Sequence, residues 1–257
     1  MQANFFLIFD TANWGVFAFL LLVAGVVFWL ERSDRFHLAY SKYRRGGTLN
    51  TRVAMTVIYA PALILSVLGY FAVLAPDTLY HRLLFLAFAF HFAKRVLESL
   101  FLHRYSKPMG WGTTIMISLL YSLIALSFND AHNMTTTVLQ AESLALAPLF
   151  VGLVIFLLGQ GINFYHHWIL RNLRGQKDQA YKVPAGGLFG LVACPHYLGE
   201  IIAWFGLALM SRQLIVWGIF WVIFGYLAGR AIGTRRWYRA HVPDYPEQGR
   251  ALIPYLL

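Results

Sequence analysis

The chain has 257 residues, of which 59% are hydrophobic and 12% are charged, and its formal net charge is +10. A soluble domain carries about 25% charged residues, so this composition excludes an ordinary soluble protein. The basic excess requires no nucleic-acid partner, because Lys and Arg collect in the cytoplasmic loops of membrane proteins. A single cysteine, Cys194, excludes an internal disulfide framework, and we interpret it as a small buried residue.

Seven apolar runs predict the helices. In chain order they cover about Trp14–Leu30, Val53–Leu74, Leu79–Leu102, Trp111–Phe128, Leu144–Leu170, Leu188–Met210 and Leu214–Gly229. Several have the roughly 17–25 residues that a spanning helix needs, whereas the last run is short. There is neither an internal repeat nor a low-complexity linker. We therefore predict an all-α, polytopic membrane protein with about seven transmembrane helices, organised as one domain over residues 1–257.

The basic residues predict the orientation of these helices. Seventeen of the 21 Lys and Arg residues fall in the loops and tail on one side, whereas Arg82 and Arg212 fall on the other. This asymmetry predicts an outside N-terminus and a cytoplasmic C-terminus. No basic residue precedes the first run, which argues against a signal peptide. The location would be a bacterial inner membrane or the endoplasmic reticulum.

The third run carries an unusual group of polar residues. His91, Arg95 and Glu98 share one helix face, and Lys94 lies four residues before Glu98. Ionisable groups at membrane depth face the protein interior or a wet cavity and mark functional sites. An ion-pair cluster that joins two helices would also explain them. We favour a ligand-lining face, because the bases outnumber Glu98 and the surplus charge suits a phosphorylated ligand.

The fifth run ends in a polar stripe. Asn163, His167, Arg171 and Arg174 recur at i, i+4, i+8 and i+11, along one face that continues out of the bilayer. The two arginines alone would fit ordinary interfacial anchors. Together with Asn163 and His167 at membrane depth, they favour the wall of a ligand groove.

The sixth run opens with His196, Tyr197 and Glu200 at helical spacing. Tyr197 is a candidate proton donor, with Glu200 holding it or a ligand amide in place. Alternatively, Tyr197 belongs to the interfacial aromatic belt and Glu200 is half of a buried pair. A carboxylate in such a run needs a partner in either case.

The tail mixes cations and aromatic residues around Arg235, Arg236 and Tyr238. Guanidinium groups match phosphates in geometry, so this segment is a candidate for binding a phosphorylated cofactor. Binding of anionic lipid headgroups is the alternative.

Several motifs together resemble the C-terminal domain of the steroid 5α-reductase family, which includes the very-long-chain trans-2-enoyl-CoA reductases. They are Leu170-Arg-Asn-Leu-Arg174, Gly186-Gly-Leu-Phe189, Cys194-Pro-His-Tyr-Leu-Gly-Glu200, Arg236-Trp-Tyr238 and Asp244-Tyr-Pro246. The family-like part covers about residues 144–257. The third-run motif Lys94-Arg95-x-x-Glu98 is more similar to the enoyl-CoA branch, whereas Gly186-Gly-Leu-Phe189 is more similar to the steroid branch.

The resemblance implies a seven-helix membrane reductase. It would use NADPH to reduce a C=C bond conjugated to a carbonyl group, in a lipid of the 3-oxo-Δ4 steroid or trans-2-enoyl-CoA type. By the same resemblance, the dinucleotide contacts would be Asn163, Arg171, Arg174, Glu200, Arg230 and Tyr238. Our candidate cofactor site adds His167, His196, Arg235 and Arg236. The resemblance makes Tyr197 the expected proton donor and Lys94 an important lysine, and we add Glu98 and Tyr59 as catalytic candidates.

The chain departs from the steroid branch at the substrate carbonyl. Those enzymes carry a Gln-Glu pair just before a proline in the second helix, where this chain has Ile58 and Tyr59 before Pro61. Their catalytic tyrosine of the third helix aligns with Phe92. Tyr59 is our candidate for a substitute carbonyl donor, and the substrate class stays open.

Two rival functions remain. A membrane methyltransferase of the isoprenylcysteine or phospholipid type would bind S-adenosylmethionine. A lipid transporter would use the same charges along a permeation path, although the absence of internal repeats counts against it. We favour the reductase, as a monomer with its active site towards the cytoplasm. Its substrate would come from the bilayer, and no metal site is predicted.

Overall fold

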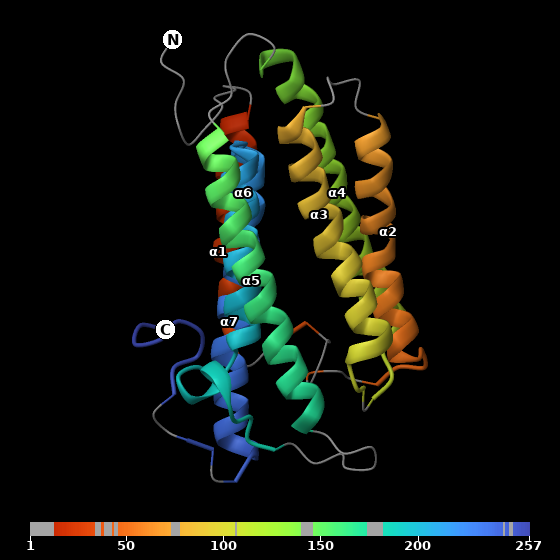
Figure 1. The fold of residues 1–257 in the computed structure, drawn as a ribbon. Coiled ribbons are helices and arrows are strands. Elements are labelled where there is room, and N and C mark those ends of the chain that lie inside the picture. The colour runs from red at the N-terminus through yellow and green to blue at the C-terminus, as the bar shows by residue number, and fades with distance from the viewer. Residues whose placement is uncertain are drawn as a thin grey trace.

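The computed structural model describes residues 13–33, 37–38, 43, 46–72, 78–105, 107–139, 146–173, 182–243, 245–246 and 249–257. Arg174 and Asp244, which were named above, lie outside these ranges. Within them the chain forms seven α-helices and no strand, which confirms the all-α prediction (Figure 1). The helices are α1 (Asn13–Arg32), α2 (Thr51–Ala72), α3 (Leu79–Leu97), α4 (Trp111–Leu139), α5 (Leu146–Leu173), α6 (Pro195–Ser211) and α7 (Leu214–His241).

Each helix corresponds to one predicted run, and successive helices run in opposite directions (Figure 1). Among the described residues, five helices are long and apolar enough to cross a membrane, namely α1, α2, α4, α5 and α7. α3 carries five basic or imidazole side chains and α6 has only 17 residues, so neither meets both conditions. These apolar helices support an integral membrane protein.

Two predicted boundaries were wrong. The sixth helix begins at Pro195 rather than near Leu188, because a residue before proline avoids the helical region and Cys194 has φ −133° and ψ 60°. Before it, Gly187–Gly190 form a short 3₁₀ turn. The seventh helix is not short: it has 28 residues, about 42 Å, because its basic C-terminal third continues the helix. Cys194 is buried, as predicted.

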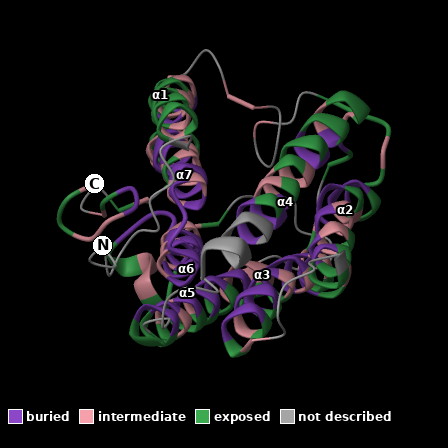
Figure 2. Ribbon diagram, turned by 90° about the horizontal axis from the view of Figure 1, so that it is seen from above, coloured by how far each residue is buried: buried purple, intermediate pink, exposed green. Residues whose placement is uncertain are grey.

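The helices pack in two groups. α1 packs against α7 and α5 against α6, whereas α2 packs against both α3 and α4 (Figure 2). Glycines permit the close pairs: a Cβ on Gly159 of α5 would lie 2.3 Å from the backbone nitrogen of Ala203 in α6, and one on Gly225 of α7 would lie 2.5 Å from the carbonyl oxygen of Ala24 in α1. Small residues at such crossings let membrane helices approach closely.

A cluster of aromatic side chains joins the two groups of helices through α3, α4 and α6. Phe88 of α3 stacks on Phe128 of α4 with ring centroids 3.7 Å apart, and Trp204 of α6 meets Phe88 edge-on at 6.2 Å. All three rings are buried. This aromatic cluster fixes α3 between α4 and α6, and thereby positions the polar residues of the next turns of α3.

Candidate active site

A large cavity of about 1020 Å³ lies between the two groups of helices. Its apolar part is lined by residues of α1 and α4, such as Phe19, Val23, Leu120 and Ile124. These two helices stand apart in the view from above (Figure 2). Its polar part lies at the end of the bundle where α1, α5 and α7 finish. Ligand pockets are typically about 300–1000 Å³, so this cavity has room for more than one small molecule.

Glu98 is the centre of an ion-pair cluster directly behind the polar end of the cavity. It opens a π-helical turn, Glu98–Leu102, directly after α3, and π turns in helices are frequent at functional sites. Lys94 Nζ lies 2.8 Å from one carboxylate oxygen, and Arg95 and His167 each lie 3.1 Å from the other. Glu98 is 3% exposed. The structure thus contains the ion-pair cluster that the sequence left as an alternative.

Asn163 connects this cluster to α6. Its side-chain oxygen accepts a hydrogen bond from Lys94 at 2.5 Å, and its Nδ2 donates to the carbonyl oxygen of His196 at 2.8 Å. The same Nδ2 lies 3.5 Å from the carboxylate of Glu200. Asn163 is buried, so it positions the first turn of α6 rather than lining the cavity.

Tyr59 of α2 reaches the cavity from the other side. Arg95 donates a hydrogen bond of 2.7 Å to the Tyr59 oxygen, and the guanidinium carbon lies 4.8 Å from the ring centroid. Both residues line the cavity. A cation at its oxygen polarises the phenol and makes its O–H a stronger donor.

Tyr197 and Glu200 line the cavity opposite Tyr59. The ring of His196 lies 4.3 Å from the Tyr197 ring and 5.5 Å from His167. Tyr197 is partly exposed, whereas Glu200 is buried. The first two turns of α6 therefore present a phenol and a carboxylate to the cavity, at the helical spacing noted in the sequence.

Four cations surround the mouth of the cavity, where it meets the loops. They are Arg104, Lys107, Arg171 and Lys182. Only Arg171 was predicted, and it packs over the Trp168 ring at 5.2 Å. The other three lie on loops between helices, where no periodic pattern marks them. Together they form a donor set that suits phosphate groups.

Arg230 has a partner that the sequence did not predict. It lies 3.0 Å from the carboxylate of Glu31, at the end of α1, and is 1% exposed. The other Glu31 oxygen accepts a hydrogen bond from the backbone N–H of Leu38 at 2.9 Å. The guanidinium also packs against Tyr43 at 5.2 Å. Arg230 lines the cavity, but its charge is already paired.

Three groups outside the spanning helices have shifted pKa values. Burial raises the pKa of Tyr43 to about 12, against the opposing effect of the Arg230 charge. Burial likewise raises the pKa of Tyr245, which stacks on Tyr238, to about 12. Burial and the neighbouring positive charges lower the pKa of His103 to about 2. At neutral pH both phenols are therefore protonated and His103 is neutral.

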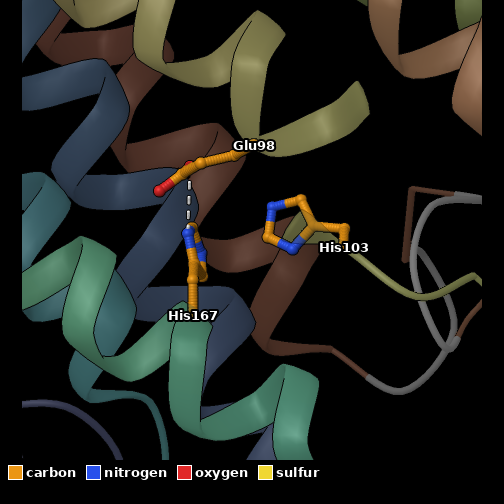
Figure 3. A group of neighbouring side chains, drawn as sticks. All are labelled: Glu98, His103 and His167. Atoms are coloured by element: carbon orange, nitrogen blue, oxygen red, sulfur yellow. Dashed lines mark hydrogen bonds and ion pairs between the residues drawn. The ribbon is translucent and has the colours of Figure 1, made fainter. Parts of the chain in front are cut away.

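Among the described residues, one group has the spacing of metal ligands: Glu98, His103 and His167 (Figure 3). His103 and His167 meet edge-on at 4.7 Å between ring centroids. However, Lys94 and Arg95 already lie on the two carboxylate oxygens of Glu98. Their positive charges would repel a metal cation, so we interpret the group as part of the ion-pair cluster.

The predicted site residues thus fall into distinct sets. Those that line the cavity are Tyr59, His167, Arg171, His196, Tyr197, Glu200, Arg230 and Tyr238. Lys94, Glu98 and Asn163 support them from behind. Arg235 and Arg236 line a separate pocket on another face of α7. Arg174 lies outside the described residues.

Comparison with known proteins confirms the resemblance. A family profile described as 3-oxo-5-alpha-steroid 4-dehydrogenase matches residues 112–257. A 3-oxo-5-alpha-steroid 4-dehydrogenase 1 of Bos taurus is 31% identical over 229 residues, covering 85% of this chain and 87% of the relative. A steroid 5-alpha-reductase DET2 of Gossypium hirsutum is 42% identical over 106 residues, 41% of each chain. A very-long-chain enoyl-CoA reductase of Dictyostelium discoideum is 28% identical over 201 residues, 71% of this chain and 60% of the relative.

Proposed function

Because this chain belongs to the 3-oxo-5-alpha-steroid 4-dehydrogenase family, we propose that it reduces a C=C bond conjugated to a carbonyl group in a lipophilic substrate, with NADPH. The relatives are oxidoreductases that act on CH–CH groups. The observation that carries the proposal is the division of one cavity into an apolar chamber, a polar end that includes the phenols of Tyr59 and Tyr197, and a cationic mouth. NADPH, when bound, supplies the hydride for the β-carbon.

Tyr59 polarises the substrate carbonyl. Negative charge develops on the carbonyl oxygen as the β-carbon is attacked, and one preorganised donor to such an oxygen contributes about 3–4 kcal/mol. The Tyr59 oxygen accepts from the Arg95 guanidinium at 2.7 Å, which directs the phenol and strengthens its O–H as a donor. Tyr59 is thus the carbonyl donor that replaces the Gln-Glu pair of the steroid branch, as we suggested from the sequence.

Tyr197 donates the proton to the α-carbon. It lies on the first turn of α6, next to His196 and one turn before Glu200, and it lines the cavity together with Tyr59. Lys94 and Glu98 act from behind: their pair at 2.8 Å, together with Asn163, fixes the start of α6. They are therefore positioning residues.

The mouth holds the anionic part of the cofactor. The phosphates of a dinucleotide need fixed cations, which Arg104, Lys107, Arg171 and Lys182 provide at the end of the cavity. Tyr238 of α7 lines the same region with an aromatic ring. The residues present thus fit NADPH. The excess of basic residues in the loops at this end makes it the cytoplasmic end.

The apolar chamber binds the lipid part of the substrate. Its walls on α1 and α4 belong to helices with many exposed apolar residues, such as Phe19 and Leu123, so a substrate dissolved in the bilayer has a short route to it. Apolar walls of this kind suit a fused-ring substrate and an acyl substrate equally well. The substrate is a 3-oxo-Δ4 steroid or a trans-2-enoyl thioester.

The proposal is tested by NADPH consumption in the detergent-purified protein. A 3-oxo-Δ4 steroid and a long-chain trans-2-enoyl-CoA are offered in parallel, and the reduced product is identified by mass spectrometry. Turnover of either substrate supports the reductase and identifies the branch. If NADPH does not bind and S-adenosylmethionine does, the proposal is wrong and the chain is a methyltransferase.

We expect Arg171→Gln to weaken NADPH binding about tenfold, because a hydrogen bond to a charged group contributes about 1.5–3 kcal/mol. The rate at saturating NADPH should change little, since Arg171 lies at the mouth rather than near the phenols. The measurement is the Kd of NADPH by fluorescence titration. Arg52→Gln is the matched control, because Arg52 is exposed at the same end and does not line the cavity. An unchanged Kd in Arg171→Gln would remove this residue from the cofactor site.

We expect Tyr59→Phe to lower kcat about 10- to 100-fold, since it removes a charge-assisted donor while keeping the ring. KM for the substrate should change less than kcat, because the interaction strengthens as charge develops on the carbonyl oxygen. Tyr121→Phe is the control, because Tyr121 packs against Tyr59 at 5.2 Å and also lines the cavity. An equal loss in both variants would mean that a general disturbance of packing, rather than the Tyr59 hydroxyl, causes the effect.

A further inference from the structure

One polar side chain lies in the apolar chamber of the main cavity, away from the polar end. This part of the chamber is lined by three helices: by α4 after Tyr121, by α1 before Val27 and by α7 before Tyr226. Among the described residues of these three segments, Ser127 of α4 is the one polar residue that lines the cavity. The others carry hydrocarbon side chains, like Ile124. The proposed chemistry at the two phenols does not use the Ser127 hydroxyl.

The Ser127 hydroxyl has no hydrogen-bond partner within the part of the chain that the structure describes. Other serines of the apolar helices have one. Ser66 and Ser122 each donate to the carbonyl oxygen four residues earlier, at 2.6 and 2.8 Å, and Ser118 donates to the carbonyl oxygen of Val57 at 2.8 Å. A hydroxyl group in an apolar environment is unfavourable unless it is hydrogen-bonded. Ser127 is therefore available to a ligand that enters the chamber.

The position of Ser127 sets its distance from the reacting carbonyl group. Tyr121 packs beside Tyr59, the proposed carbonyl donor, with ring centroids 5.2 Å apart. Ser127 comes six residues later, about 9 Å further along the axis of α4, and α4 runs away from the mouth. Ser127 shares one face of α4 with Leu120 and Ile124, which also line the cavity. A substrate that spans these two levels would therefore meet a hydrogen-bonding group at each end.

A hydroxyl at this distance distinguishes between the two substrate classes. A saturated acyl chain offers only methylene groups there and would leave Ser127 without a partner. A fused-ring skeleton with an oxygen at the end remote from its enone would provide one, and a serine hydroxyl both donates and accepts. A water molecule is a poor substitute, because a buried water needs several polar partners and Ser127 is the one polar side chain among the described lining residues of this part.

We propose that Ser127 is a specificity-determining residue, which hydrogen-bonds a second oxygen of a rigid fused-ring enone at the end remote from the reduced double bond. The inference rests on the proposed function and narrows its substrate to this class. Ser127 takes no part in hydride or proton transfer, since it lies about 9 Å beyond the level of Tyr59. Its hydrogen bond is the same in the ground state and the transition state, so its loss should raise KM and leave kcat nearly unchanged.

The test compares two 3-oxo-Δ4 steroids that differ only in the remote oxygen, androst-4-ene-3,17-dione and androst-4-en-3-one, with the detergent-purified full chain. The wild type is expected to have a kcat/KM about fivefold higher for the dione, as for one neutral hydrogen bond. Ser127→Ala should lose this preference through KM, and should reduce androst-4-en-3-one as the wild type does. Ser122→Ala is the matched control and should keep the preference, because Ser122 lies on the same helix but does not line the cavity.

Equilibrium binding of both ketones, measured by quenching of tryptophan fluorescence, separates this inference from the reductase proposal. If neither ketone is reduced but the wild type binds the dione about fivefold more tightly than Ser127→Ala does, Ser127 selects the ligand and the reductase proposal is wrong. If both ketones are reduced with equal kcat/KM, or Ser127→Ala keeps the preference, the inference is wrong and the reductase proposal stands. A wild type that binds neither ketone would also overturn the inference.

Discussion

Tyr197→Phe is expected to lower the turnover rate by about 10²–10⁴-fold, the usual contribution of a positioned proton donor, while the Kd of NADPH stays near the wild-type value. The substitution removes one hydroxyl from the first turn of α6 and keeps the ring that packs beside His196 at 4.3 Å. The cations at the mouth of the cavity, which would hold the cofactor phosphates, are untouched. Binding and chemistry should therefore separate in this variant.

The measurement combines single-turnover kinetics with a fluorescence titration of NADPH. A loss of rate without a loss of cofactor binding assigns Tyr197 to the chemical step. His196→Gln serves as a comparison, because it changes the neighbouring ring but not the phenol, and it should cost less. Wild-type turnover in Tyr197→Phe would remove this residue from the mechanism and leave Tyr59 as the remaining phenol that we assign to the chemistry.

The helices, and the polar clusters whose members are close together in the sequence, were predictable because they depend only on neighbouring residues. Long apolar runs predict helices directly, and all seven were found. The spacing of Lys94, Arg95 and Glu98 likewise placed them within reach of one another, and their ion pairs, which we had kept as the alternative to a ligand-lining face, are contacts of three and four residues along one helix. His196, Tyr197 and Glu200 reach one region for the same reason.

Contacts between distant segments could not be predicted in the same way. Arg95 donates to Tyr59, 36 residues away, and Arg230 pairs with Glu31, 199 residues away. No periodicity in one helix indicates which helix it will face. Loop cations such as Arg104 and Lys182 reach the cavity mouth only because their loops converge there. The separation of Arg235 from Arg230, in contrast, was available from the 100° step of a helix.

A double-mutant cycle is expected to show strong coupling between Glu31 and Arg230 in the free energy of unfolding. The exposed fractions are 4% and 1%, and the two groups lie 3.0 Å apart. Removing one partner of a buried pair leaves an uncompensated charge, which destabilises by about 3–5 kcal/mol. Glu31→Gln and Arg230→Gln should therefore each lower the Tm by more than about 5 °C.

The double variant Glu31→Gln/Arg230→Gln should be more stable than the sum of the single effects predicts, because neither charge is then left alone. The Tm is measured without NADPH, so a role of Arg230 in cofactor binding does not enter. Arg52→Gln, an exposed arginine at the same end, is the control and should change the Tm by about 1 °C or less. Additive losses would mean that the pair itself contributes little and that each side chain stabilises α1 and α7 separately. A coupled loss would instead show that the pair fixes α1 to α7. That contact positions one wall of the cavity, which Arg230 lines. Arg230 is also a candidate contact of the cofactor. The double variant should therefore regain stability without regaining the full affinity for NADPH.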